Sequence, residues 1–235
     1  MVEWRLSVSS SWRKDVFKFF AILIKIMFYK LLISIIVIAA LSQIAFAANL
    51  NTWNIDVNIN EDGTVDEKVT FIYNESVEKS DYFIFSRITD VQVFADNVSV
   101  ECEINTEIGT SIVCKDINAE TIEYNFKALD LTDIFGDLKI FRYKFSITQI
   151  TDKFSVTVKL PFGDVLADRS KLDRLGLAPF EPLYGKEGSD GRRILVRWIL
   201  DYPQLGDSVG VSVLYEHIGV AQLAVLAVSI IAVII

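Results

Sequence analysis

The sequence is poor in the residues that most often build catalytic and metal sites. Its 235 residues include one histidine, His217, and two cysteines, Cys102 and Cys114. Zinc sites usually need about four ligands, so two cysteines and a remote histidine do not suggest a metal centre. The motifs G-x-S-x-G and H-E-x-x-H and the Lys-Ser/Thr ending of a P-loop are also absent. We therefore expect no enzyme, no metal and no cofactor, although an acid pair among the many carboxylates stays open.

Positive charge is also scarce. The chain has 23 Lys and Arg against 31 Asp and Glu, which gives a net charge of −8. A nucleic-acid partner is not expected, because binding phosphates requires a basic surface. The chain is 51% apolar, which excludes a disordered protein and is high for a purely soluble one.

The charges divide the chain into three parts. Residues 1–48 carry six basic and two acidic residues, residues 49–217 carry 17 basic and 29 acidic residues, and residues 218–235 carry none. A basic flank before an apolar segment stays in the cytoplasm, so the acidic part should be exported. The sequence thus predicts a basic n-region with a signal peptide or signal anchor at 1–48, an extracytoplasmic domain at 49–217 and a transmembrane helix at 218–235.

Two apolar segments carry this prediction. Residues 31–48 would span about 27 Å as a helix, and Ala45-Phe46-Ala47 is typical of a cleavage site, so both a cleaved signal peptide and an uncleaved anchor remain open. The preceding residues 16–30 suit an interfacial helix or a long n-region. Residues 218–235 contain one Gln and one Ser among 18 residues, which predicts a membrane helix with lipid as its partner.

The central part has the two-residue alternation of β-strands. Apolar residues alternate from Trp53 to Ile59, Asp62-Gly63 provides a hairpin turn, and the alternation resumes from Val65 to Tyr73 with Glu67 as the exception. We expect an all-β sandwich of about ten or eleven strands, with a possible boundary between two smaller units near 130–137. Further strands are expected at 82–86, 88–95, 98–104, 110–115, 120–129, 138–148, 153–160, 193–200 and 208–216.

Residues 161–192 form the longest stretch without strand character. A two-turn helix is expected at 168–175, capped by Asp168 and ended by Gly176, and the glycine-rich residues 185–191 should form a turn. Phe180, Leu183 and Tyr184 are apolar in this otherwise polar region, so they are candidates for contact with an envelope or membrane protein. Alternatively, they close one end of the sandwich. His217 is expected to be an interfacial residue beside the C-terminal apolar segment.

Two pairs of residues suggest covalent modification outside the cytoplasm. Cys102 and Cys114 flank a turn near Ile108-Gly109 that places Ile104 opposite Ile112. A disulfide is therefore expected, with free buried thiols as the alternative. Asn74 and Asn97 begin N-x-Ser sequons, which makes both candidate glycosylation sites.

Four segments carry a resemblance to a known group of proteins. INEDGTVDEKVTFIYN, LPFGDVLAD, GSDGRRILVRW and SVGVSVLYE, in this order before a final apolar segment, resemble the membrane-anchored β-sandwich ectodomain proteins of archaea. The resemblance implies a cell-membrane protein with its β domain outside, and it supplies no catalytic residues. Some members continue into a cytoplasmic winged-helix domain, so a structural or binding module of the envelope and the sensing ectodomain of a signalling protein both remain open. An envelope hydrolase is a weaker alternative.

Overall fold

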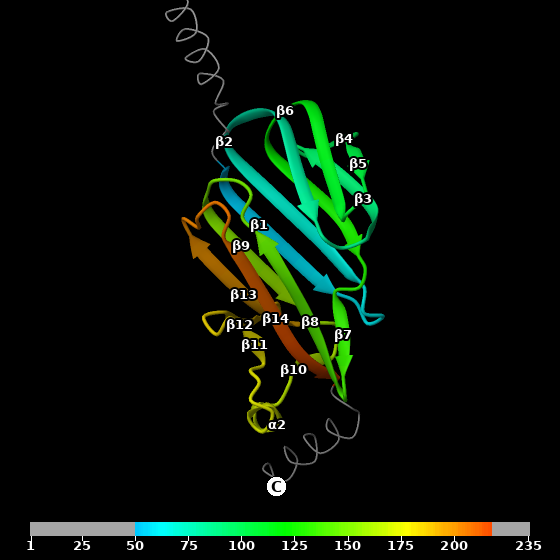
Figure 1. Ribbon diagram of the computed structural model, residues 1–235, viewed down its shortest axis with the longest axis vertical. Coiled ribbons are helices and arrows are strands. Elements are labelled where there is room, and N and C mark those ends of the chain that lie inside the picture. The colour runs from blue at the N-terminus through cyan, green and yellow to red at the C-terminus, as the bar shows by residue number, and fades with distance from the viewer. Residues whose placement is uncertain (1–49, 218–235) are drawn as a thin grey trace, which may run out of the picture. The chain divides into compact units, whose positions relative to one another are not determined.

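The computed structural model describes residues 50–217, and over these residues the chain forms two β-sheets and one short helix (Figure 1). The predicted all-β fold is confirmed. The first sheet contains β1 (Leu50–Ile59), β2 (Val65–Ile84), β3 (Ile88–Ala95), β4 (Val98–Val100), β5 (Glu103–Asn105), β6 (Thr110–Ala128), β9 (Thr151–Lys159), β12 (Lys186–Ser189) and β13 (Ile194–Asp201). The second contains β7 (Thr132–Phe135), β8 (Leu138–Ser146), β10 (Asp164–Leu166), β11 (Phe180–Glu181) and β14 (Ser208–His217).

The order of strands in the first sheet is β12-β13-β9-β1-β2-β6-β3-β4, with β5 also paired to β6, and in the second it is β10-β14-β8-β7, with β11 paired to β14. The chain enters the second sheet between β6 and β7, within the expected boundary at 130–137, and returns to the first sheet at β9. One hydrophobic core contains residues of both sheets, and Phe145 of β8 lies 6.2 Å from Phe154 of β9 between ring centroids. The two sheets therefore share a core, and 130–137 does not separate two domains.

The described part of the chain has fourteen strands, more than the ten or eleven expected. Several of the additional strands have only two to four residues, too few to show an alternation. Other strands were expected to be separate but are joined. Those at 65–73 and 82–86 form the single strand β2, and those at 110–115 and 120–129 form β6. The separate strands predicted there were wrong.

β2 and β6 are continuous because they bend together. Their pairing shifts register between Ile72 and Lys79, and both strands arch over in Figure 1. Tyr82 and Glu67 are 15 residues apart on β2, about 50 Å in a straight strand. The Tyr82 hydroxyl nevertheless donates a hydrogen bond of 2.9 Å to Glu67 Oε1. The strand has therefore folded back over its own core face.

Glu67 lies inside this bend. It shares the side of β2 occupied by core residues and is 2% exposed. Glu67 Oε2 has no hydrogen-bond partner among the described residues. Burial raises the pKa of Glu67 to about 7, an effect that the Tyr82 hydrogen bond partly opposes. The exception in the strand alternation is therefore a carboxyl group in the core.

The cysteine prediction is confirmed. Cys102 and Cys114 form a disulfide with a Cα–Cα distance of 4.4 Å, and Ile104 pairs with Ile112 in the register expected from the turn. The bridge ties β6 to the short segment between β4 and β5. The Asp62-Gly63 turn is also present, with φ of +83° at Gly63, where glycine adopts a conformation that other residues rarely take.

The region 161–192 holds more structure than its sequence suggested. It contains the short strands β10, β11 and β12 in addition to α2 (Arg169–Asp173). Asp168 caps α2 by accepting a hydrogen bond of 2.9 Å from the Ser170 backbone N–H, and Gly176 follows the helix with φ of +66°. These two helix signals are confirmed, but α2 has five residues and not the two turns expected over 168–175. The glycine-rich residues 185–191 include an edge strand, β12, so the prediction of a turn was wrong for 186–189 and holds for 190–191.

The predicted signal segment at 1–48 and membrane helix at 218–235 lie outside the described residues. Within residues 50–217, no helix has the length and apolar character needed to cross a bilayer.

Candidate binding site

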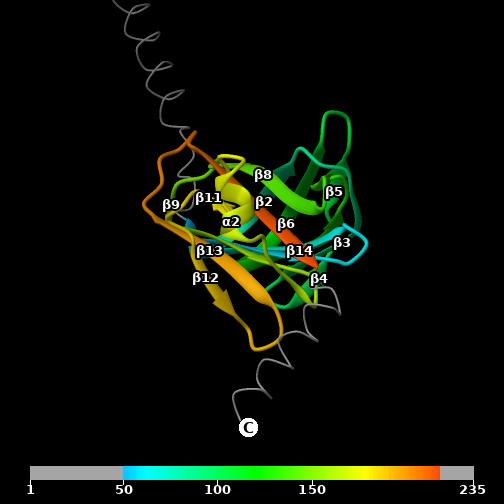
Figure 2. The ribbon, with the colours of Figure 1, turned by 90° about the horizontal axis from the view of Figure 1, so that it is seen from below.

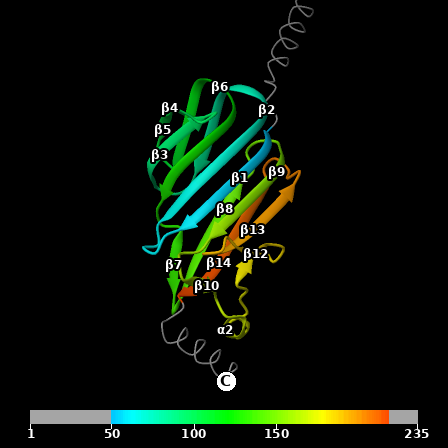
Figure 3. The same ribbon diagram turned by 180° about the vertical axis from the view of Figure 1, so that it is seen from behind.

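The outer face of the first sheet is polar. Its side chains pair with one another across neighbouring strands, which lie side by side in Figure 3. Ser155 donates a hydrogen bond of 2.6 Å to Asn54 Oδ1, and Arg197 Nε donates one of 3.0 Å to Thr157 Oγ1. Ser155 and Thr157 are buried beneath their neighbours, whereas Asn54 is half-buried and Arg197 is exposed, so the polar groups of this face are paired where water does not reach them.

The outer face of the second sheet is mixed and only partly covered. Of the residue pairs that β8 and β14 place on it, Ile140–Leu214 is apolar, whereas Arg142–Ser212, Lys144–Gly210 and Ser146–Ser208 are not, so its apolar part lies toward α2. Leu172 of α2 packs against Leu138, Ala167 and Leu214, which form a second, smaller cluster of buried residues. Leu214 N also donates a hydrogen bond of 2.8 Å to Pro179 O, which holds the segment after α2 against β14. The remainder of this face, toward β7, has no such cover among the described residues.

A groove of about 270 Å³ lies in this remaining part, between β7 and residues 177–181. We call it the β7 groove. Ile134 and Phe135 are exposed, because β7 is the edge strand of its sheet. The apolar residues that line the groove are Ile134, Phe135, Ile140, Leu177, Ala178 and Leu214.

Polar side chains complete the lining of the β7 groove. Asp133, Arg142, Glu181 and Ser212 also contribute to it. Its volume is below the roughly 300–1,000 Å³ of typical small-molecule sites. The groove therefore suits one or two apolar side chains with a polar backbone beside them, rather than a cofactor.

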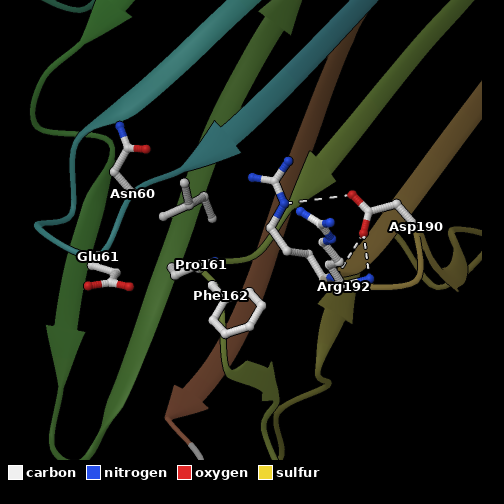
Figure 4. Close-up of a pocket in the computed structure, with 8 residues that line it drawn as sticks. Asn60, Glu61, Pro161, Phe162, Asp190 and Arg192 are labelled. Carbon is white, nitrogen blue, oxygen red and sulfur yellow. Dashed lines mark hydrogen bonds and ion pairs between the residues drawn. The ribbon is translucent and has the colours of Figure 1, made fainter.

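A larger hollow of about 600 Å³ lies beside the β1–β2 and β12–β13 turns (Figure 4). One of its two acidic groups is used within its own turn: Asp190 accepts hydrogen bonds from the backbone N–H groups of Arg192 (3.0 Å) and Arg193 (2.8 Å), whereas Glu61 lies in the β1–β2 turn. These bonds lower the pKa of Asp190, and Arg193 Nε lies 3.7 Å from the same carboxylate. Asp190, Arg192 and Arg193 thus form one turn, and the hollow lacks the apolar wall that the β7 groove has, so we do not regard it as the binding site.

His217 is better anchored than its sequence position suggested. It ends β14, and its Nδ1 lies 2.7 Å from Oδ1 of the buried Asp164 on β10. Lys139 Nζ of β8 lies 3.6 Å from the other oxygen, Asp164 Oδ2. The His217 ring itself is largely exposed. The cluster joins three strands at one end of the second sheet.

The three candidate contact residues separate in the structure. Phe180 is buried in the core, with its ring 6.2 Å from that of Trp198. Leu183 and Tyr184 are exposed in the following turn, which is held by a 2.8 Å hydrogen bond from Trp198 Nε1 to Pro182 O. Phe180 therefore supports the alternative that the segment closes the core, and partner contact through Leu183 and Tyr184 stays a prediction.

Both sequon asparagines are exposed. Asn97 lies in the β3–β4 turn with φ of +67°, as expected for the end of a strand. Asn74 lies within β2 at its register shift, not at a strand end. Both positions are open to solvent, and their glycosylation stays a prediction.

Sequence reasoning missed the β7 groove. Its walls come from residues 132–135 and 177–181, which are more than 40 residues apart and meet only when α2 folds over the second sheet. One signal was available: Ile134 and Phe135 are adjacent apolar residues in a short segment before Gly136 and Asp137. Adjacent residues of a strand point to opposite faces, so a short strand is not expected to bury both side chains.

Comparisons with known proteins give no family. No family model matches the sequence, and no curated protein matches it. Among solved structures, an M1 zinc metallopeptidase from Deinococcus radiodurans aligns at a TM-score of 0.39 and 8% identity, over 70% of this chain and 42% of that one. Legionella pneumophila aminopeptidase A aligns at 0.41 and 8%, over 70% and 21%. The folded domain of Mycobacterium tuberculosis LppM aligns at 0.33 and 10%, over 77% and 97%. The chain thus spans less than half of both peptidases, and all three similarities are too weak to indicate an activity.

Proposed function

We propose that the protein is a membrane-anchored protein of the cell envelope whose β domain lies outside the cytoplasm and binds another envelope protein through the β7 groove. The observation that carries the proposal is the contrast between two outer faces. The first sheet has a polar face whose side chains pair with one another, whereas the second has a groove beside the edge strand β7 in which six of the ten lining residues are apolar.

The occupant that fits best is an extended segment with apolar side chains. An edge strand has unpaired backbone groups that can hydrogen-bond to an added strand. Ile134 and Phe135 stand beside that edge, and the groove has room for one or two apolar side chains. Arg142 and Glu181 would contact polar groups of the same segment.

Two further observations support the location. The Cys102–Cys114 disulfide is typical of proteins in an oxidising compartment. The basic residues 1–48 and the acidic residues 49–217 have the charge asymmetry of an exported domain. The uncharged residues 218–235 would be the anchor.

Site-specific photocrosslinking in intact cells tests the binding proposal. The full-length chain would carry a benzophenone side chain at Ile134, which is 81% exposed in the groove wall, or at Ile108, which is 83% exposed in the β5–β6 turn. We expect a discrete crosslinked product from position 134 and none of that size from position 108. The same products from both positions, or none from position 134, would contradict the proposal.

A further inference from the structure

Three segments surround the end of β14. In β8, Lys139 pairs with Tyr215. Lys171 of α2 forms an ion pair of 2.6 Å with Glu216. In the β9–β10 turn, a Cβ atom at Gly163 would lie only 3.4 Å from the His217 ring. We call this the His217 end of the domain, and Figure 2 looks onto it, with α2 near the middle of the view.

Exposed apolar side chains occur on these same segments. Phe162, in the β9–β10 turn, is 66% exposed, and Leu175, just after α2, is more than half exposed. A hollow of about 400 Å³ joins α2 to the β7–β8 turn, and Phe135, Leu175, Lys171 and Arg174 contribute to its lining. Apolar and basic side chains are thus neighbours here, together with the acidic Asp137, and no protein element lies over them among the described residues.

The sequence indicates what covers them. Residue 217 is followed directly by 18 residues without a charge. If these residues are the membrane anchor, the lipid around them lies next to the His217 end. We propose that the His217 end rests on the bilayer, with Phe162 and Leu175 in the interfacial layer of the lipid. This inference rests on the proposed function, because it requires residues 218–235 to be the membrane anchor.

The chemistry of the His217 end suits a lipid surface. Phe and Leu side chains on a surface with a basic polar part can insert at the boundary between acyl chains and headgroups. The long side chain of Arg174 can keep its charge at the headgroup phosphates while its aliphatic part lies deeper, whereas the charge of Lys171 is paired with Glu216. The domain as a whole is acidic, with 29 Asp and Glu against 17 Lys and Arg in residues 49–217, so headgroup phosphates would repel most of its surface. The domain would therefore stand on this end, with β9 and β14 extending away from the membrane.

Spin-label accessibility tests the contact on the chain without residues 1–48 in phosphatidylcholine–phosphatidylglycerol nanodiscs. Single cysteines would replace Phe162 or Leu175, and Ile150 or Leu205 as controls. Each control precedes β9 or β14, so it lies about 30 Å or more from the His217 end. Since Leu50 N donates a hydrogen bond to Ile150 O, the test requires a mature chain from which residues 1–48 have been cleaved. Ile150 is 58% exposed, and Leu205 is also more than half exposed. The native cysteines are joined in a disulfide and would not react. A label at Val225 reports on the anchor itself.

The readout is accessibility to oxygen, which concentrates in lipid, relative to a water-soluble nickel chelate. We expect a ratio several-fold higher at Phe162 and Leu175 than at Ile150 and Leu205. Equal ratios at these four sites with a high ratio at Val225 would overturn the inference that the His217 end contacts lipid. This result would still agree with residues 218–235 as the membrane anchor. A low ratio at Val225 would overturn both the membrane anchor at 218–235 and the contact of the His217 end with lipid. Low accessibility to both reagents at Phe162 and Leu175 would mean that protein, such as a second copy, covers this end, which would also overturn the inference.

Discussion

The buried carboxyl group of Glu67 should make the domain less stable as the pH rises. The unfolded chain releases this proton near pH 4.5, whereas in the folded protein the pKa is raised to about 7. Below about pH 4.5 both states hold the proton, and between these values only the folded state does. The free energy of unfolding should therefore fall across this window by about 3 kcal/mol, since each pKa unit corresponds to about 1.4 kcal/mol.

Glu67→Gln isolates this contribution, because an amide cannot ionise. We expect the difference in unfolding free energy between Glu67→Gln and the wild type to grow by about 3 kcal/mol from pH 4.5 to pH 8. Glu78→Gln is the matched control, because Glu78 is exposed on the same strand, and its difference from the wild type should change far less. Urea unfolding of the full-length chain in detergent, followed by tryptophan fluorescence, gives these values.

A second variant tests the hydrogen bond to the carboxyl group. The Tyr82 hydroxyl lowers the pKa of Glu67 and so opposes the effect of burial. Tyr82→Phe should therefore move the upper limit of the pH-dependent window above 7. If Glu67→Gln and the wild type show the same pH dependence between 4.5 and 8, the assignment of a buried, protonated Glu67 is refuted.

Three further predictions concern the disulfide, the segment after α2 and the orientation. Cys114→Ala with Cys102→Ala should lower the unfolding free energy by about 3 kcal/mol in the chain-entropy treatment of a short loop, and alkylation of unreduced protein should label neither cysteine. Phe180→Ala should cost about 3 kcal/mol, seen as a fall in Tm of several degrees, whereas Leu183→Ala should change Tm little; equal falls would show that the turn is part of the core. Protease added to intact spheroplasts should cleave within residues 49–217, and protection until the membrane is broken would contradict the proposed orientation.

Local patterns in the sequence predicted the β fold well. The alternation from Trp53 to Ile59, the Asp62-Gly63 turn and the mirrored cysteines each depend on neighbours a few residues away. The long bend of β2 could not be predicted in this way. It depends on a register shift between two strands and on Tyr82 meeting Glu67 across the core, which is a tertiary contact.

The candidate site shows the same limit. Phe180, Leu183 and Tyr184 were grouped because they are apolar residues in a polar region, but the sequence does not specify which of them the fold buries. The β7 groove depends on two segments brought together by the packing of Leu172 against the second sheet. The sequence pattern predicts the helix α2, but it does not predict that α2 leaves the strand β7 uncovered.

The most direct test of the central claim is to fill the β7 groove and measure the loss of binding. Ala178 lines the groove and is partly exposed, so Ala178→Trp should occupy the space without disturbing the core. In the chain with the crosslinker at Ile134, this substitution should reduce the crosslinked product at least about ten-fold, the effect of losing one well-packed apolar contact, with Tm nearly unchanged. An unchanged yield in a stably folded Ala178→Trp protein would contradict the claim that the groove is where the partner binds.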